Sequence, residues 1–324
     1  MSAALAAGRA RVARGREGRS SDDAGNSLRE GLVVASHGRH LVVETPERQR
    51  VRCHPRGKKS EAVVGDRVRW AAAGDEGVVE QIEPRRNLLF RQDTWRSKSF
   101  AANLDAILLL VAVEPVFGES QLARALIAAA QAGIPAWVAL NKTDLPAADS
   151  ARARLAPYAA MGVPLVELAL KAEREASRAR LAPLLHGRST LVLGPSGSGK
   201  STLINLMVPA AGAQVGEISR ALASGRHTTT TTSWYWLGDS PADGALIDSP
   251  GFQQFGLHQV AAGELAALMP DLAPFVGGCR FQNCSHRQEP GCALRAAAER
   301  GAISATRWRI FAELHDELSA PRRW

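Results

Sequence analysis

The sequence predicts a multidomain protein: a small β-barrel of the OB type, an α/β domain built on a parallel sheet, and a small helical domain that carries a cysteine cluster. Short strands separated by turn residues follow one another between residues 31 and 89. Strands alternate with helices from about residue 103, which is typical of a parallel sheet with right-handed crossovers. The expected divisions are a disordered basic arm (1–28), the barrel (29–98), the α/β domain (99–257) and the C-terminal domain (258–324).

Composition limits the functions to consider. The 324 residues carry a formal net charge of +8, which favours a polyanionic partner such as nucleic acid. The longest apolar run, residues 106–113, is too short to cross a bilayer, so no membrane association is expected. Three of the four cysteines are clustered, which favours metal binding in a reducing cytoplasm over a disulfide framework.

The first part of the chain is expected to bind RNA. Residues 1–28 lack apolar periodicity, and such an arm either contacts phosphates or is only a solvated tail. Five candidate strands (31–34, 40–44, 51–54, 66–70 and 77–82) fit an OB-fold, a barrel that often binds RNA. An SH3-like barrel with a solvated basic face is the alternative. Cys53 is expected to be a small core side chain. The basic residues of this region are Arg50, Arg52, Arg56, Lys58, Lys59, Arg67 and Arg69.

A phosphate-binding P-loop follows a buried strand at residues 189–193. The stretch Gly-Pro-Ser-Gly-Ser-Gly-Lys-Ser fits G-x-x-x-x-G-K-[ST], in which glycines let successive amides point at phosphate oxygens. Lys200 is expected to reach the β- and γ-phosphates, and the Ser201 hydroxyl to bind Mg²⁺. The expected phosphate-binding residues are Gly194, Pro195, Ser196, Gly197, Ser198, Gly199, Lys200, Ser201 and Thr202.

The motif Asn141-Lys142-Thr143-Asp144 selects guanine. The Asp144 carboxylate can accept from both the N1–H and the 2-amino group of guanine, whereas adenine has neither donor. The Asn141 side chain can bond the base and tie this loop to the P-loop, and the stem of Lys142 can cover the base. GTP or GDP is therefore the expected ligand. The alternative hypothesis is a P-loop ATPase or kinase, and competition between nucleotides for binding would test it.

The segment Asp248-Ser-Pro-Gly251 fits D-x-x-G, where Asp248 holds Mg²⁺ through water and the Gly251 amide meets the γ-phosphate. The preceding threonine run offers Thr228, Thr229 or Thr230 to complete the magnesium shell, although it also fits an edge strand. The expected magnesium residues are Ser201, Thr229 and Asp248.

The glutamine that usually orients the attacking water is missing from its position after D-x-x-G. Ras-like enzymes place a glutamine after D-x-x-G, but this chain has Phe252 there. His227 is the nearest replacement, and its alternative role is packing or rRNA contact. The expected catalytic residues are His227, Lys200 and Thr229, and the free protein is expected to hydrolyse GTP slowly.

The order of the motifs is unusual, because Asn-Lys-x-Asp precedes the P-loop instead of following D-x-x-G. The same sheet forms from a circularly permuted chain when the original ends lie close together. The α/β domain is therefore expected to be a circularly permuted P-loop GTPase.

The C-terminal cluster has the spacing C-x4-C-x-H-x5-C, and chance clustering is its alternative explanation. Three thiolates and an imidazole make a closed tetrahedral zinc site without an open position for water. Helices are expected to flank it at residues 260–268 and 302–318. The expected zinc ligands are Cys279, Cys284, His286 and Cys292.

Together these motifs, from about Gly31 to the C-terminus, resemble the family of ribosome small-subunit-dependent GTPases A (RsgA, also called YjeQ). The resemblance implies an OB-fold, a permuted GTPase domain and a zinc domain. It also implies a cytoplasmic monomer that binds the 30S subunit and 16S rRNA in late maturation. Because the D-x-x-G segment leads directly into the zinc domain, docking of that domain on the subunit is expected to stimulate hydrolysis. The alternative is a non-catalytic rRNA-binding module that uses GTP as a conformational ligand. Where relatives carry Ser-Ala-Lys, this chain has Ala169-Leu170-Lys171, a loop that usually meets the guanine oxygen through a backbone amide.

Overall fold

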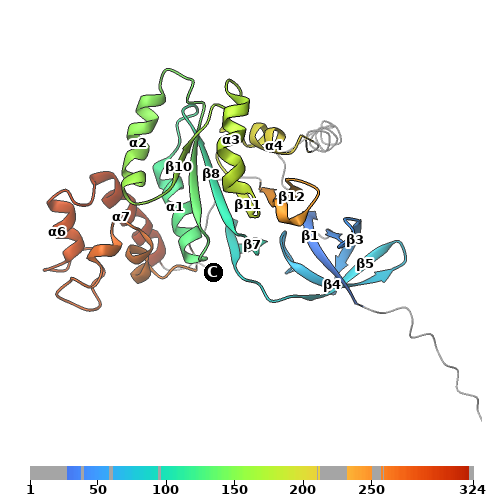
Figure 1. Cartoon of the computed structure of the whole chain (residues 1–324). Coiled ribbons are helices and arrows are strands. Elements are labelled where there is room, and N and C mark those ends of the chain that lie inside the picture. The colour runs from blue at the N-terminus through green and yellow to red at the C-terminus, as the bar shows by residue number, and fades with distance from the viewer. Residues whose placement is uncertain are drawn as a thin grey trace, which may run out of the picture.

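The barrel, the α/β domain and the C-terminal domain follow one another in space, with the α/β domain in the middle (Figure 1). The computed structural model describes residues 28–37, 40–57, 61–93, 96–209, 211, 232–249, 257 and 259–320. The predicted basic arm, apart from residue 28, lies outside these residues, as do Lys58 and Lys59.

Five strands close the predicted OB-type barrel. Their pairing order is β1-β2-β3-β5-β4 and back to β1, with β3 and β5 parallel. Val33, Leu41, Cys53 and Trp70 fill the interior and are each at most 2% exposed, so Cys53 is the core side chain that was predicted. The strands are β1 (Arg29–His37), β2 (His40–Glu44), β3 (Arg50–Pro55), β4 (Arg67–Ala73) and β5 (Glu76–Ile82).

The α/β domain has the predicted parallel sheet. Its strand order is β10-β9-β8-β11-β13-β12, and only the edge strand β12 is antiparallel to its neighbour within this set. Every residue of β8 is buried, as expected for a strand that is covered on both faces. The strands are β8 (Ala106–Ala112), β9 (Ala136–Asn141), β10 (Leu165–Glu167), β11 (Ser189–Leu193), β12 (Ser233–Trp236) and β13 (Ala245–Asp248).

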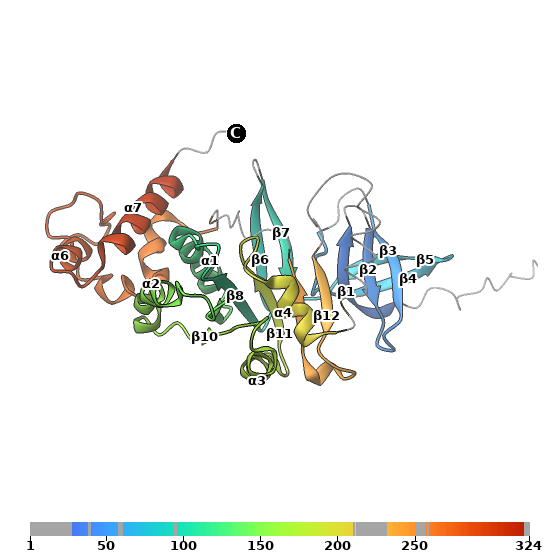
Figure 2. The same cartoon turned by 90° about the horizontal axis from the view of Figure 1, so that it is seen from above.

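Two pairs of helices cover the two faces of this sheet (Figure 2). Helices α1 (Glu119–Gln131) and α2 (Ala148–Ala160) pack in the same core as Ile107 and Leu109 of β8. Helices α3 (Arg174–Leu185) and α4 (Lys200–Met207) pack in the core that contains Leu108 of the same strand. Successive side chains of β8 therefore point to opposite faces of the sheet, and each face is covered by one pair of helices. A short 3-10 helix, η1 (Pro241–Asp243), precedes β13.

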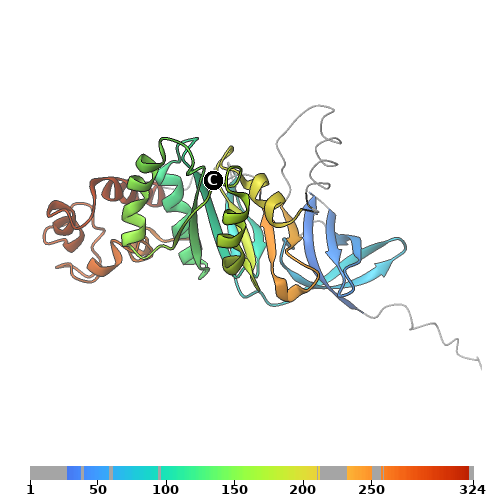
Figure 3. The ribbon, with the colours of Figure 1, turned by 45° about the horizontal axis from the view of Figure 1, so that its top comes forward.

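The barrel and the α/β domain share one sheet, which the sequence did not predict. Ala35 of β1 pairs with Ser233 of β12, so eleven strands form a continuous sheet from β10 to β4 (Figure 3). Beside this junction, the indole Nε1 of Trp236 donates to Glu44 Oε1 at 2.6 Å. The Arg48 guanidinium lies 4.0 Å from the centre of the Trp236 ring. These contacts fix the barrel against the edge of the α/β sheet.

A hairpin of β6 (Leu88–Asp93) and β7 (Arg96–Ala102) was also not predicted, and β7 crosses the expected boundary after residue 98. The hairpin stands out from the body of the molecule (Figure 2). Its base is anchored by Leu89 and Ala101, which are buried in the core of the α/β domain.

The C-terminal domain packs against α1. Leu265 and Phe311 share a core with Ala123 and Ile127 of α1. The predicted helix at residues 260–268 is a 3-10 helix, and α6 was not predicted. Among the described residues, no helix is both long and apolar enough to cross a membrane. The elements are η2 (Ala262–Leu268), η3 (Ala273–Phe275), α6 (Ala293–Glu299) and α7 (Ala305–Ser319).

Candidate nucleotide and metal sites

The P-loop joins β11 to α4 and needs glycine because other backbone lies very close. A Cβ atom on Gly194 would lie 2.1 Å from the carbonyl oxygen of Leu110. Gly199 has a left-handed φ of +107°, and a Cβ there would lie 2.4 Å from Asn141 Nδ2. A side chain at Gly194 would collide with the backbone of β8, and one at Gly199 would collide with the Asn141 side chain of the base-binding segment.

Lys200 and Asp248 face each other across the carboxyl ends of neighbouring strands. The Lys200 ammonium donates to the carbonyl of Gly194 at 2.6 Å and to that of Pro195 at 3.3 Å, so it lies across the P-loop. Desolvation lowers the pKa of Lys200, and the Asp248 carboxylate opposes this. Desolvation raises the pKa of Asp248, against the effect of the Lys200 charge. Together with the Ser201 hydroxyl at the start of α4, this carboxylate supplies the oxygen ligands that Mg²⁺ prefers.

Asn141 joins three loops of the candidate site. Its Nδ2 donates to the Ser198 carbonyl at 2.8 Å, which is the link to the P-loop that the sequence predicted. Its Oδ1 accepts from the Leu170 amide at 3.1 Å, and the side chain is only 3% exposed. Because both ends of the amide are used, Asn141 fixes the distance between the P-loop and the loop at residues 169–171.

The loop at residues 169–171 keeps one amide available despite its departure from Ser-Ala-Lys. The Ala169 amide donates to Ser177 Oγ at 3.1 Å, and the Leu170 amide is taken by Asn141. Among the residues that the structure describes, the Lys171 amide has no hydrogen-bond acceptor. It is the candidate donor to the guanine oxygen.

The other residues of the Asn-Lys-Thr-Asp segment are held by backbone groups. Lys142 adopts a left-handed φ of 62°, and its ammonium donates to the Glu114 carbonyl at 2.6 Å. The Thr143 hydroxyl donates to the Leu168 carbonyl at 3.1 Å. Asp144, which follows these anchored residues, is exposed, and its role in base recognition stays a prediction.

Several predicted site residues lie outside the described part of the chain. They are His227, Thr229 and Gly251, with the alternatives Thr228 and Thr230 and with Phe252. The structure does place Lys200 of the predicted catalytic set, and Ser201 and Asp248 of the magnesium set. The roles of His227, Thr229 and Gly251 stay predictions.

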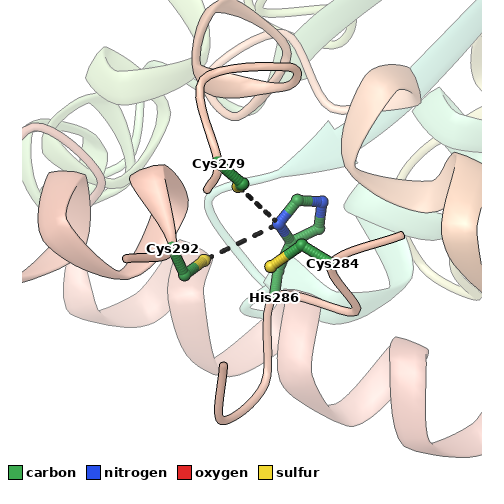
Figure 4. A group of neighbouring side chains, drawn as sticks. All are labelled: Cys279, Cys284, His286 and Cys292. Carbon is green, nitrogen blue, oxygen red and sulfur yellow. Dashed lines mark hydrogen bonds between the residues drawn. The ribbon is translucent and has the colours of Figure 1, made fainter. Parts of the chain in front are cut away.

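The predicted zinc ligands come together in the C-terminal domain (Figure 4). One ligand atom from each of Cys279, Cys284, His286 and Cys292 lies within 4.8 Å of all the others. His286 Nδ1 is 3.4 Å from Cys279 Sγ and 3.6 Å from Cys292 Sγ, so this nitrogen faces the centre. Four N and S ligands in a compact group fit a closed tetrahedral zinc site.

Neighbouring groups also shape this cluster. The Glu289 carboxylate accepts from the amides of Ser285 at 2.8 Å and Arg287 at 3.2 Å, on either side of His286. Desolvation and the adjacent thiols raise the pKa of Cys284 to about 12. A divalent cation is what makes three thiolates favourable at such close range, so the cluster fits a metal ion.

Sequence reasoning did not identify the supporting roles of Ser177 and Glu289. Ser177 is fully buried on α3, and its hydroxyl orders the loop before that helix. The glutamate lies inside the cysteine motif, but the spacing alone does not reveal that its carboxylate accepts from three backbone amides, those of Ser285, Arg287 and Gln288. Both roles depend on side-chain direction, which only the folded chain defines.

Comparison with known proteins decides the family. The family model described as RsgA GTPase matches residues 82–258, which is more than half of the chain. The chain belongs to the RsgA GTPase family. It is therefore a GTP hydrolase, as the motifs predicted, and not a P-loop kinase.

Relatives cover nearly the whole length of the chain. A protein of Variovorax paradoxus named small ribosomal subunit biogenesis GTPase RsgA is 58% identical over 300 residues, covering 91% of this chain and 94% of that protein. A protein of the same name from Burkholderia pseudomallei is 50% identical over 298 residues, with the same two coverages of 91% and 94%. The family assignment therefore extends beyond the GTPase domain into the barrel and the cysteine cluster.

Solved structures confirm the permuted fold. The crystal structure of YjeQ from Thermotoga maritima superposes with a TM-score of 0.67 at 27% identity, covering 91% of this chain and all of that one. YloQ, described as a circularly permuted GTPase, superposes with a TM-score of 0.65 at 24% identity and covers 94% of this chain and all of its own. The motif order thus reflects a circular permutation, as expected.

Proposed function

We propose that this chain is a GTPase of small-ribosomal-subunit biogenesis, which binds the 30S subunit through 16S rRNA late in maturation and whose GTP hydrolysis the subunit stimulates. The observation that carries the proposal is the double hydrogen bond of Asn141, which joins the guanine loop to the P-loop. The name of the 58% identical relative supports the ribosomal role.

In the proposed complex, each part of GTP meets a different loop. The P-loop amides and Lys200 bind the phosphates, and Ser201, Asp248 and Thr229 bind Mg²⁺ directly or through water. The Gly251 amide meets the γ-phosphate. Asp144 accepts from the guanine N1–H and 2-amino group, and the Lys171 amide donates to the guanine oxygen. His227 is proposed to hold the attacking water. Zinc is proposed to be the ion in the Cys₃His cluster, where it would act structurally.

The barrel is proposed to contact rRNA, although most of its described arginines already face glutamates. Exposed ion pairs of this kind contribute little stability, so phosphate groups can replace the glutamates at low cost. Replacement of several partners by phosphates would make binding strongly salt-dependent. The pairs of this kind are Arg52 with Glu76, Arg56 with Glu80, and Arg69 with Glu30 and Glu83, whereas Arg50 pairs with Glu44, which is buried.

The deciding experiment measures GTP hydrolysis by the purified protein with and without 30S subunits. We expect slow hydrolysis alone, strong stimulation by 30S subunits and no competition from ATP. GTP binding without hydrolysis in both conditions would favour the alternative, a non-catalytic rRNA-binding module. Light scattering tests the proposed monomer, and fractionation of cells tests the proposed cytoplasmic location.

A further inference from the structure

A loop between β8 and α1 touches both segments proposed to bind the nucleotide. We call residues 113–118 the bracing loop. The Lys142 ammonium donates to the carbonyl of Glu114 in this loop at 2.6 Å. On the other side, a Cβ added to Gly197 of the P-loop would lie 3.2 Å from Cδ of Pro115. The bracing loop therefore lies against the base-binding segment and the phosphate-binding segment at once.

The bracing loop is held from α2 by Arg154. The Arg154 Nη2 donates to the Phe117 carbonyl at 2.6 Å, and its guanidinium carbon lies 4.3 Å from the centre of the Phe117 ring. The Arg154 Nε lies 3.4 Å from Oε1 of Glu119, the first residue of α1. A planar guanidinium can make all three contacts together, whereas a shorter or uncharged side chain cannot.

The residue one turn further along α2 supports the same segment. The Tyr158 hydroxyl donates to the Glu119 carbonyl at 3.4 Å, and the side chain is fully buried. On its far side lies Arg307 of α7, whose guanidinium carbon is 5.3 Å from the centre of the Tyr158 ring. Arg307 is in turn paired with Asp271 at 2.8 Å. The face of α2 that holds the bracing loop is thus backed by the C-terminal domain and has little freedom to shift.

We propose that Arg154 is a positioning residue for GTP binding. It acts through the bracing loop: by fixing the Phe117 carbonyl, it keeps the Glu114 carbonyl in place for Lys142 and keeps Pro115 against Gly197. This inference rests on the proposed function, because that function assigns Lys142 to the base and Gly197 to the phosphates.

The expected defect is in binding and not in the chemical step. Lys142 covers the base, which is bound equally in the ground state and in the transition state. An interaction that is equal in both states changes KM and leaves kcat unaffected. Loss of Arg154 is therefore expected to raise KM for GTP and to leave kcat at saturating GTP near that of the wild type.

The test compares Arg154→Met with the matched control Arg152→Met. Met keeps an unbranched side chain over Phe117 but removes the hydrogen bond and the charge. Arg152 lies on the same helix and pairs with Asp149 and Glu167, away from the bracing loop. We expect Arg154→Met to raise KM for GTP about tenfold and Arg152→Met to leave it unchanged. Hydrogen exchange of the amides in residues 113–118 should speed up in Arg154→Met alone.

A conservative variant separates positioning from general destabilisation. The ammonium of Arg154→Lys can still donate to the Phe117 carbonyl, so we expect it to recover part of the GTP affinity. A KM of Arg154→Met equal to that of the wild type would overturn the proposal. It would also be overturned if Arg154→Met lowered kcat and thermal stability together and Arg154→Lys recovered none of the GTP affinity. If Asp144→Asn also leaves GTP affinity unchanged, the proposed function itself fails. If Asp144→Asn weakens binding and Arg154→Met does not, only the role of Arg154 is refuted.

Discussion

The side-chain amide of Asn141 donates to the backbone carbonyl of Ser198 at 2.8 Å, although the two residues are 57 positions apart in the chain. The bond connects the loop proposed to recognise guanine with the loop proposed to bind phosphates. Asn141 is buried, so water does not compete for this contact. The spacing between the two loops is therefore set before GTP arrives.

Base choice is tested by Asp144→Asn. An amide cannot accept from both guanine donors, so we expect GTP affinity to fall about a hundredfold or more. Xanthosine triphosphate, whose base offers an acceptor to the new amide, should bind better to the variant than to the wild type. Competition assays with both nucleotides measure this exchange. Unchanged GTP affinity in the variant would contradict the assignment of Asp144 to the base.

Zinc content is tested with Cys284→Ser and His286→Ala. Purified wild type is expected to contain one zinc ion per chain, because a single Cys₃His cluster was found among the described residues. Either variant should lose the zinc and loosen the small C-terminal domain, because metal binding is expected to supply much of its folding free energy. Cys53→Ser is the control, because Cys53 lies in the barrel core and should leave the zinc content unchanged. Metal analysis by plasma mass spectrometry would settle the point, and a zinc-free wild type would refute it.

Stimulated hydrolysis is tested with His227→Ala. If the imidazole holds the attacking water, the rate of GTP hydrolysis with 30S subunits should be at least about tenfold lower in the variant, while its GTP affinity stays the same. Single-turnover hydrolysis with and without subunits provides the measurement. A stimulated rate equal to that of the wild type would remove His227 from the mechanism.

Acid stability is expected to depend on Asp105. Desolvation raises the pKa of Asp105, but hydrogen bonds from Ser189 and Arg86 outweigh it, so the pKa lies below its usual 3.8. A depressed carboxyl pKa stabilises the fold above the unfolded value and loses this effect as pH falls through the folded value. Asp105→Asn should therefore lower the unfolding temperature at about pH 7, and the difference should shrink below about pH 4.

The control for this experiment is Asp149→Asn, because the Asp149 side chain is 94% exposed and pairs only with Arg152 among the described residues. It should change stability little at either pH. A difference between wild type and Asp105→Asn that stays constant with pH would show that the Asp105 charge is not responsible.

Features encoded by nearby residues were predictable from the sequence. The P-loop, the Asn-Lys-Thr-Asp segment and the zinc cluster are each defined by short spacings, and their order predicted the permutation. The alternation of strands and helices from about residue 103 likewise predicted the parallel sheet of the α/β domain.

Features that depend on distant partners were not predictable. The pairing of Ala35 with Ser233 joins residues that are far apart in the chain and lack any local signature. The strands β6 and β7 carry a run of polar residues on both sides of their turn instead of a regular apolar alternation, so the hairpin was not predicted. Helix α6 has only seven residues, too few to display a periodic apolar face. The positioning contact of Arg154 depends on the path of the bracing loop, which no local pattern encodes.

The pairing of β1 with β12 also determines how the protein can be dissected. If the barrel were removed by truncation, β12 would lose its pairing with β1 at Ser233, and the Trp236 ring would lose its cover from Arg48. Open edges with exposed aromatic rings recruit strands from other molecules. A GTPase domain produced without its barrel is therefore expected to self-associate. The GTP turnover measured for it would then not represent that of the full chain. Mechanistic dissection should rely on point substitutions in the full chain.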